Sequence, residues 1–290
     1  MWGSSFLFTK IAVTAVPPTT VVAARLVIGA AVLVPGVLLA GRRMPRPGRM
    51  WMWFAALAVV GNALPFWLIS WGQQRIDSGL AGILMAVMPL ATVLLAHWFV
   101  EGERLTGPKI VGFVVGFAGV VVLIGPEALL TLGGSGSALV AQLAVLGGAV
   151  CYACNAILAR RRPASDPLVA AAGMTLVAAV LMTPMAAVVE DVPSNLNLSA
   201  GAGLAIAYLG AVATAAATVV FFVLVTAAGP SFMSLINYLI PVWAVGLGMA
   251  VLDERPAISA VGALALVLGG IALTEWRRPP SAAVPPSDKA

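Results

Sequence analysis

Two stretches of 21 residues decide the architecture of this chain: GLAGILMAVMPLATVLLAHWF at 79–99 and SFMSLINYLIPVWAVGLGMAV at 231–251. A helix of about 20 apolar residues crosses the hydrocarbon core of a bilayer, so each stretch predicts a membrane span. Each carries a proline at its centre, and Pro241 follows Pro89 by 152 positions. Two spans with the same central proline indicate that the chain repeats itself.

Further landmarks recur at nearly the same separation. Pro18, Pro35 and Gly61 return 149 positions later, Gly112 and Gly119 return 150 positions later, and Glu103-Arg104 returns 151 positions later, as Pro167, Pro184, Gly210, Gly262, Gly269 and Glu254-Arg255. A duplication followed by small loop insertions leaves this kind of drift. We predict a first repeat at 1–126, a second repeat at 127–278 and a disordered polar tail at 279–290.

Ten segments reach or approach the length of a span. They are 2–16, 20–40, 50–71, 79–99, 108–125, 138–158, 167–189, 200–226, 231–251 and 257–275. Each half holds five spans, an odd number, so the second half must enter the membrane in the opposite orientation. The sequence therefore predicts an all-α integral membrane protein, with ten transmembrane helices arranged as two inverted five-helix repeats. This architecture recurs among transporters.

The composition agrees with a protein surrounded by lipid. Apolar residues make up 61% of the 290 residues and charged residues 9%, and the mean hydropathy is +1.04. Soluble domains average about a quarter charged residues, so a soluble protein is excluded. Of the 16 Lys and Arg residues, twelve fall in the loops and tail on the side of the N-terminus. Such an excess marks the cytoplasmic side, so both termini are expected in the cytoplasm, and the net charge does not indicate nucleic-acid binding.

The two central prolines predict flexible points. Pro89 and Pro241 leave the carbonyls of Met85 and Asn237 without a helical donor, because proline has no N–H. Unpaired carbonyls at membrane depth need a partner or a water-filled cavity. We expect both prolines to act as hinges, with the Met85 and Asn237 carbonyls facing a substrate. The alternative is a static kink.

Polar and aromatic side chains away from the span ends are candidates for contacting a substrate, since ligand sites are mostly apolar with a few polar groups. Lys10 lies deep in the first span and is expected to meet either a substrate carboxylate or a helix C-terminus. Arg25 lies near the start of its span and is expected to reach the outer interface. The remaining candidates are Asn62, Trp67, Tyr152, Asn155, Asn237 and Tyr238, and the interfacial aromatic belt is the alternative for the tryptophan and the tyrosines.

Several absences narrow the chemistry. Asp and Glu are missing from the middle of every predicted span, which disfavours exporters of organic cations and favours neutral or zwitterionic solutes. Proton coupling and facilitated diffusion both stay open. One histidine and two cysteines give neither metal ligands nor a catalytic constellation, so no cofactor, metal or enzymatic activity is expected. The glycines at 112–119 and 262–269 predict close helix packing within a monomer, with a homodimer as the alternative.

The opening WGSSF, Arg25 early in span two, the central M-P and I-P pairs, the E-G-E-R and D-E-R turns and the glycine-spaced spans five and ten occur in one order along the chain. This ordered set resembles the drug/metabolite transporter superfamily, EamA-type branch, and within it the bacterial aromatic-amino-acid exporters of the YddG type. The resemblance implies an inner-membrane exporter of amino acids, aromatic ones, methionine and other neutral ones included, which works by alternating access. A carrier of nucleotide sugars or lipid-linked sugars is the alternative within the superfamily.

Overall fold

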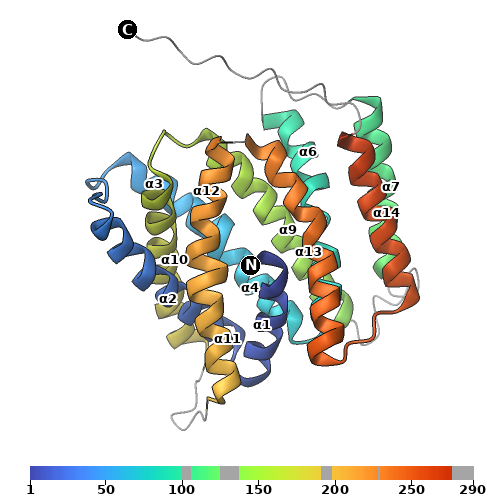
Figure 1. Ribbon diagram of the computed structural model, residues 1–290, viewed down its shortest axis with the longest axis horizontal. Coiled ribbons are helices and arrows are strands. Elements are labelled where there is room, and N and C mark those ends of the chain that lie inside the picture. The colour runs from blue at the N-terminus through green and yellow to red at the C-terminus, as the bar shows by residue number, and fades with distance from the viewer. Residues whose placement is uncertain (100–105, 125–136, 191–197, 228, 276–290) are drawn as a thin grey trace.

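The computed structural model describes residues 1–99, 106–124, 137–190, 198–227 and 229–275, and these residues form helices and connecting turns with no strand among them (Figure 1). The helices are α1 (Trp2–Ala15), α2 (Pro18–Leu39), α3 (Arg49–Ala58), α4 (Leu64–Gln73), α5 (Ser78–Met85), α6 (Met88–Phe99), α7 (Gly107–Ile124), α9 (Ser137–Arg161), α10 (Pro167–Val189), α11 (Ala200–Gly210), α12 (Ala217–Ala227), α13 (Gly229–Leu252) and α14 (Ile258–Glu275). The predicted tail at 279–290 and the pair Glu103-Arg104 lie outside the described residues.

Six helical segments of the described chain are long and apolar enough to span a membrane. They are Pro18–Leu39, Arg49–Gln73, Ser78–Phe99, Ser137–Arg161, Pro167–Val189 and Ala200–Thr226. Each coincides with one of the predicted spans. The helices α1, α7, α13 and α14 correspond in sequence to the other four predicted spans, and membrane crossing by these four stays a prediction.

Two of the long segments contain a π-helical turn. The turn η1 (Val59–Ala63) joins α3 to α4, and the turn η2 (Ala211–Ala216) joins α11 to α12. A π-turn inserts an extra residue into the helix and disturbs the regular hydrogen-bond ladder, and such turns are frequent at functional sites. Both turns occur in the third predicted span of their half.

The helix at Pro89 is interrupted, whereas the helix at Pro241 is not. α5 ends at Met85, and the N–H groups of Ala86 and Val87 bond to carbonyls three residues back, in the tighter 3₁₀ pattern. α6 then begins at Met88. Pro241, in contrast, lies inside the continuous helix α13. The expected pair of equivalent bends is therefore unequal, because only the first proline coincides with a break in the backbone.

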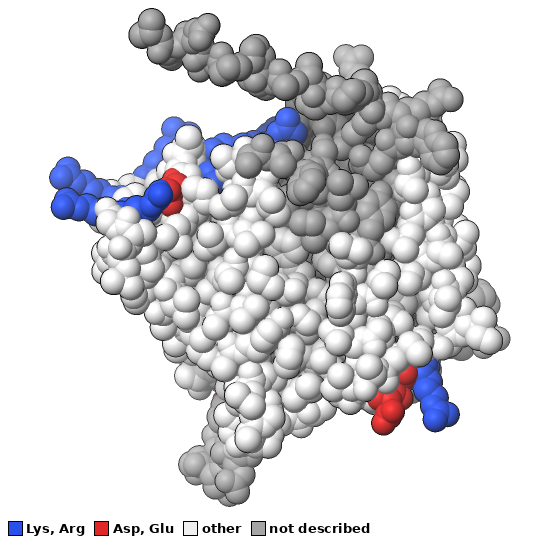
Figure 2. All heavy atoms as spheres, viewed as in Figure 1, with Lys and Arg blue, Asp and Glu red and all other residues white. Residues whose placement is uncertain are grey.

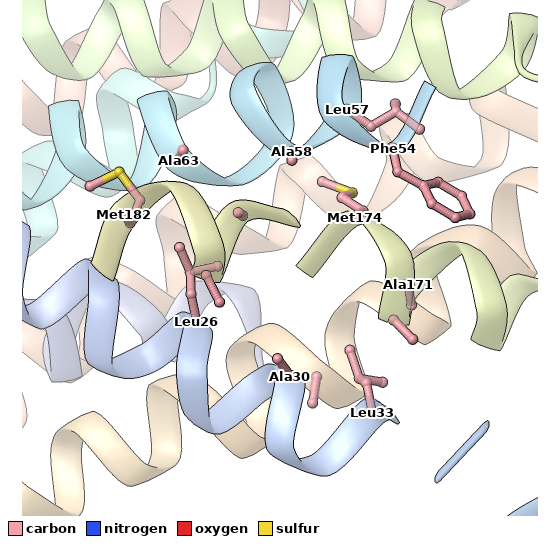
Figure 3. Close-up of a cluster of buried hydrophobic side chains, with 14 of the residues drawn as sticks. Leu26, Ala30, Leu33, Phe54, Leu57, Ala58, Ala63, Ala171, Met174 and Met182 are labelled. Carbon is pink, nitrogen blue, oxygen red and sulfur yellow. The ribbon is translucent and has the colours of Figure 1, made fainter. Parts of the chain in front are cut away.

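A large apolar core forms where α2, α3 with η1, and α10 pack together (Figure 3). Leu26, Phe54 and Met174 are at most 2% exposed there. The Phe54 ring occupies the space that a side chain at Gly173 would fill. This core joins helices from the first half of the sequence to α10 of the second half.

On the face shown in Figure 2, the charged side chains of the described residues gather at two opposite edges and leave a broad uncharged band between them. One edge is dominated by Lys and Arg. Arg42, just after α2, forms an ion pair with Asp166, which also caps the N-terminus of α10 through Leu168 N and Val169 N. Large apolar side chains such as Val180 and Leu204 are exposed on the helices between the edges, as expected of a surface that faces lipid.

Glycines bring α7 and α14 into close contact, as predicted, but through a different set of residues. A side chain at Gly270 would overlap the backbone of Gly112 and Gly116, and one at Gly119 would lie 2.9 Å from the Ala263 carbonyl oxygen. A methyl group placed on Gly262 or Gly269 would meet no described atom within 4 Å, so the assignment of these two glycines to the packed face was wrong. One residue of register on a helix turns the face by about 100°.

Candidate functional site

Lys10 contacts the C-terminus of a helix. Its Nζ donates to the carbonyl oxygens of Gln73 and Ile76, each at 2.9 Å. These carbonyls belong to the last residue of α4 and to the turn that follows, where backbone acceptors lack helical donors. Of the two partners expected for Lys10, the structure shows the helix C-terminus.

Arg25 is enclosed within the bundle, so the expectation that it reaches the interface was wrong. The side chain is 4% exposed. Its Nε donates to Thr214 Oγ1 at 3.1 Å, and its Cζ lies 3.6 Å from the centroid of the Phe66 ring. The burial arises because α2 packs against α10, α4 and η2, and Arg25 lies on the face that these elements cover.

Aromatic rings continue from Arg25 toward α9. Phe66 and Tyr152 meet edge to face, with ring centroids 6.4 Å apart. Trp67 donates from its indole Nε1 to Thr19 Oγ1 at 3.1 Å and stacks on Trp71. Trp67 and Tyr152, both predicted as site residues, therefore lie half-buried in the bundle, each paired with another aromatic ring.

Two predicted site residues are buried with an unpartnered amide atom. Asn62, in η1, is 2% exposed and leaves its Nδ2 without a hydrogen-bond partner. Asn155, in α9, is 5% exposed and leaves its Oδ1 without one, while this atom lies against Gly61. Thr175 Oγ1, in α10, is likewise unpartnered. Buried polar atoms are nearly always paired with protein or water, so this group has capacity for a polar ligand.

The remaining predicted site residues are placed less fully. Met85 is the last residue of α5, at the helix break, and is 6% exposed. Pro89 and Pro241 are both buried. The side chains of Asn237 and Tyr238 lie outside the described residues, although the backbone of both belongs to α13.

The two halves contact each other through equivalent positions. Gly61, within η1, lies against Met174 of α10. Gly210, beside η2, lies against the backbone carbonyl of Arg25 in α2. The two contacts are related by a displacement of 149 positions, which takes Gly61 to Gly210 and Arg25 to Met174. In each contact the absence of a glycine side chain allows a π-turn of one half to approach the second span of the other half.

Two carboxylates of the second half cap helices of the first half. Glu190 accepts hydrogen bonds from Thr19 N, Thr20 N and Thr20 Oγ1, each at 2.8 Å, at the start of α2; we name this contact the Glu190 latch. Burial opposes ionisation of Glu190, but the hydrogen bonds from Thr19 and Thr20 outweigh it, so the pKa of this carboxyl lies below its usual range.

The second carboxylate is Glu254, which accepts from Ser78 N at 2.7 Å and from Gly79 N at 2.9 Å at the start of α5; we name this contact the Glu254 latch. The two glutamates follow the ends of α10 and α13, and both of these helices end in the lower part of the molecule in Figure 1. The sequence did not predict these contacts, because each carboxylate accepts from N–H groups 170 to 176 residues away and so leaves no local signal, although Glu254 belongs to a repeated motif. Among the described residues, no group of three metal-ligating side chains occurs.

The sequence of this chain matches that of a known protein family over most of its length. The model of the EamA-like transporter family matches residues 1–125 and 139–276. The uncharacterized transporter YoaV of Bacillus subtilis is 24% identical over 271 residues, covering 93% of this chain and 91% of the relative. An uncharacterized protein of Pseudomonas aeruginosa is 31% identical, covering 90% and 85%.

One further relative and one solved structure are also similar to this chain. The uncharacterized inner membrane transporter YedA of Escherichia coli is 25% identical, covering 86% of this chain and 78% of the relative. A solved structure, described as a crystal structure of a protein, superposes with a TM-score of 0.65 over 94% of both chains at 23% identity, which shows a shared fold.

Proposed function

This chain belongs to the EamA-like transporter family, and from that membership we propose that it exports neutral amino acids, aromatic ones and methionine included, across a bacterial inner membrane. The family and the names of the relatives indicate a membrane transporter rather than an enzyme. The name of the relative YedA supports the inner membrane as its location.

The proposed architecture is two inverted repeats of five spans, 1–126 and 127–278, with both termini in the cytoplasm. The equivalent contacts of Gly61 with Met174 and of Gly210 with Arg25 support this arrangement. So do the two π-turns at matching places, and the gathering of most of the visible Lys and Arg side chains at one edge of the molecule (Figure 2). Bundles of this kind bind substrate near the midplane, between the repeats.

The observation that carries the substrate proposal is the pair of buried amides, Asn62 and Asn155. Each leaves a polar atom unpartnered among residues that are otherwise apolar and aromatic. Nδ2 of Asn62 can donate and Oδ1 of Asn155 can accept. A free amino acid presents both an acceptor and a donor on one small head group, and the rings of Phe66 and Tyr152 offer an apolar surface for its side chain.

The enclosure of these groups supports alternating access as the proposed mode of transport. Asn62 and Asn155 are at most 5% exposed, so a substrate reaches them only when helices separate. The two latches close one end of the bundle in this conformation. The break between α5 and α6 provides a point where the fourth predicted span can bend without losing a regular helical bond.

Carriers of nucleotide sugars or lipid-linked sugars are less compatible with the site. Such substrates are strongly anionic and would need several cations. Within the described part of the predicted spans, Lys10 is engaged by backbone carbonyls, which leaves Arg25 as a cation near the aromatic group.

Transport in proteoliposomes tests the proposal. Efflux of labelled phenylalanine, methionine and leucine is measured with and without a pH gradient. Saturable flux of these amino acids is expected, and no flux of any amino acid would contradict the proposal. Strict dependence on the gradient would assign proton coupling instead of facilitated diffusion.

A substitution of Asn155 sharpens this test. Asn155→Leu is expected to lower transport at least about tenfold while leaving stability unchanged or raised, because it removes a buried unpartnered polar atom. Cys151→Ala, one turn earlier on α9, is the matched control and is expected to retain transport. Equal transport by both variants would show that Asn155 does not contact the substrate.

A further inference from the structure

Arg25 is a buried guanidinium with no acidic partner among the described residues. It is 4% exposed, and the ion pair found in the described part of the chain, Arg42 with Asp166, lies elsewhere. Its hydrogen bond goes to a neutral hydroxyl, that of Thr214. Enclosing an unpaired charge in a bundle is unfavourable unless a partner of opposite charge is supplied. A charge retained at such a place in a membrane bundle is a candidate for binding a ligand.

The surroundings of Arg25 hold the guanidinium in one orientation. Nε is bonded to Thr214 Oγ1, and the group lies over the Phe66 ring. A guanidinium has five N–H donors, so this arrangement leaves the terminal N–H groups without a hydrogen-bond partner among the described residues. A fork of terminal N–H groups matches the two oxygens of a carboxylate, which it binds through paired hydrogen bonds.

Other groups near Arg25 suit the rest of such a ligand. Thr175 and Thr214 both place their methyl groups against Gly29, one helical turn after Arg25, so the two threonines flank the same face of α2. Thr175 Oγ1 is unpartnered, and Tyr152 lies within electrostatic range of Arg25. The site combines one fixed cation, neutral polar groups and aromatic rings.

We propose that Arg25 is the carboxylate receptor of the transport site, and that this contact restricts the substrates to molecules carrying one carboxylate beside an apolar group. The inference rests on the proposed export of amino acids and adds the group that distinguishes an amino acid from its amide or amine. One forked cation neutralises one carboxylate. Thr214 and Phe66 act as positioning residues for the guanidinium.

Competition experiments in proteoliposomes test the receptor. Counterflow of labelled phenylalanine is measured against unlabelled phenylalanine, phenylalaninamide and 3-phenylpropionate. In the unmodified protein, phenylalanine and 3-phenylpropionate are expected to compete about 10- to 100-fold better than phenylalaninamide, because the amide lacks the carboxylate that forms the charge-assisted forked bonds. Equal competition by phenylalaninamide would overturn the proposal.

Variants assign the effect to Arg25. Arg25→Gln is expected to abolish the preference for phenylalanine over its amide, and Arg25→Lys, which keeps the charge but not the fork, to reduce it. Arg75→Gln is the control, because Arg75 also lies over an aromatic ring, that of Trp71, but is exposed. An undiminished preference in Arg25→Gln would also overturn the proposal.

A binding measurement separates this inference from the proposed export and does not depend on a variant that folds. Thermal stabilisation of the detergent-solubilised protein is recorded with 3-phenylpropionate and with its amide. Stabilisation by the carboxylate alone, even if no amino acid is transported, would retain Arg25 as the receptor and reject amino-acid export. Stabilisation by neither compound, or equally by both, would reject the receptor.

Discussion

Glu254 and Ser78 meet where the end of α13 crosses the start of α5, and the carboxylate accepts the Ser78 N–H at 2.7 Å. The approach requires glycine, because a side chain at Gly248 would overlap the carboxylate. Asp253, which precedes Glu254, has a positive φ of 53°, a conformation that L-residues rarely adopt. The backbone is thus held in an unfavourable conformation at the residue that directs Glu254 onto α5.

Removing the Glu254 charge is expected to open this end of the bundle. Ser78→Cys, in a background with Cys151→Ala and Cys154→Ala, gives a buried reporter thiol, and the swap breaks no hydrogen bond because Ser78 Oγ has no partner. Adding Glu254→Gln should raise several-fold the rate at which a membrane-impermeant thiol reagent labels this reporter, when the reagent is added to the side of the membrane that this end of the bundle faces. Asp77→Asn is the control, since Asp77 makes no side-chain cap bond. Equal labelling in the two variants would show that the latch does not hold this end closed.

The Glu190 latch predicts a pH dependence of stability. The pKa of this carboxyl is depressed in the folded protein, so its contribution is present above the usual glutamate range and is lost as the pH falls through the lower folded-state pKa. Thermal unfolding in detergent should show a stability advantage of the unmodified protein over Glu190→Gln, about 1 kcal/mol at neutral pH. The advantage should shrink on acidification below the usual range. A difference that grows toward acid pH would have the wrong sign and contradict the assignment.

The two equivalent glycine contacts predict unequal losses of stability. Gly210→Ala places a methyl group 2.5 Å from Ile28 Cβ and 2.9 Å from the Arg25 carbonyl oxygen, and should destabilise by about 1–3 kcal/mol. Gly61→Ala meets the ends of the Asn155 and Met174 side chains, which can move, so its loss should be smaller. Gly36→Ala in α2 has no neighbour within 4 Å and should be neutral or stabilising. Thermal unfolding of the three variants ranks these effects, and a Gly210→Ala protein as stable as Gly36→Ala would refute the close contact.

The unequal backbone at the two prolines predicts unequal effects on transport. Pro89→Ala restores a donor where α5 breaks from α6, so the span can become a continuous helix, and the transport rate should fall. Pro241→Ala changes a helix that is already continuous and should have a smaller effect. Unchanged transport in both variants would rule out the hinges.

Lys10 is expected to be structural. Lys10→Met removes the donor to the Gln73 and Ile76 carbonyls and should lower the melting temperature. The preference for phenylalanine over its amide should remain, because the carboxylate receptor is Arg25. If Lys10→Met lost the preference for phenylalanine over its amide at unchanged stability, Lys10 would instead be assigned to the substrate site.

Much of the fold could be predicted from the sequence because membrane spans are set by the length of apolar runs. The prolines predicted a bend at Pro89, where the helix breaks, but equally at Pro241, where the helix is continuous. The sequence did not predict the face of the helix on which a given residue lies. Position along a span gives the depth of Arg25, but α2 is apolar on almost every side, so periodicity could not show that Arg25 points at Thr214 rather than at lipid.

The candidate site was predictable in its residue types and less so in its partners. Asn62 and Asn155 stood out as polar residues in apolar helices, and both are buried with an unpartnered atom. The partners of Lys10 are 63 and 66 residues away along the chain, and those of Glu190 are 170 and 171 residues away. Contacts at such separations depend on how helices pack, which no local pattern specifies.

The Glu190 latch bears on the history of the chain. The residue 149 positions before Glu190 is Gly41, which has no side chain. Under the proposed duplication, two identical copies of the first half would place this glycine where α2 now receives its carboxylate. The equivalent contact at the start of α10 cannot form, because Gly41 has no carboxylate, and Asp166 caps that helix instead. At this contact the two halves of the chain are no longer interchangeable.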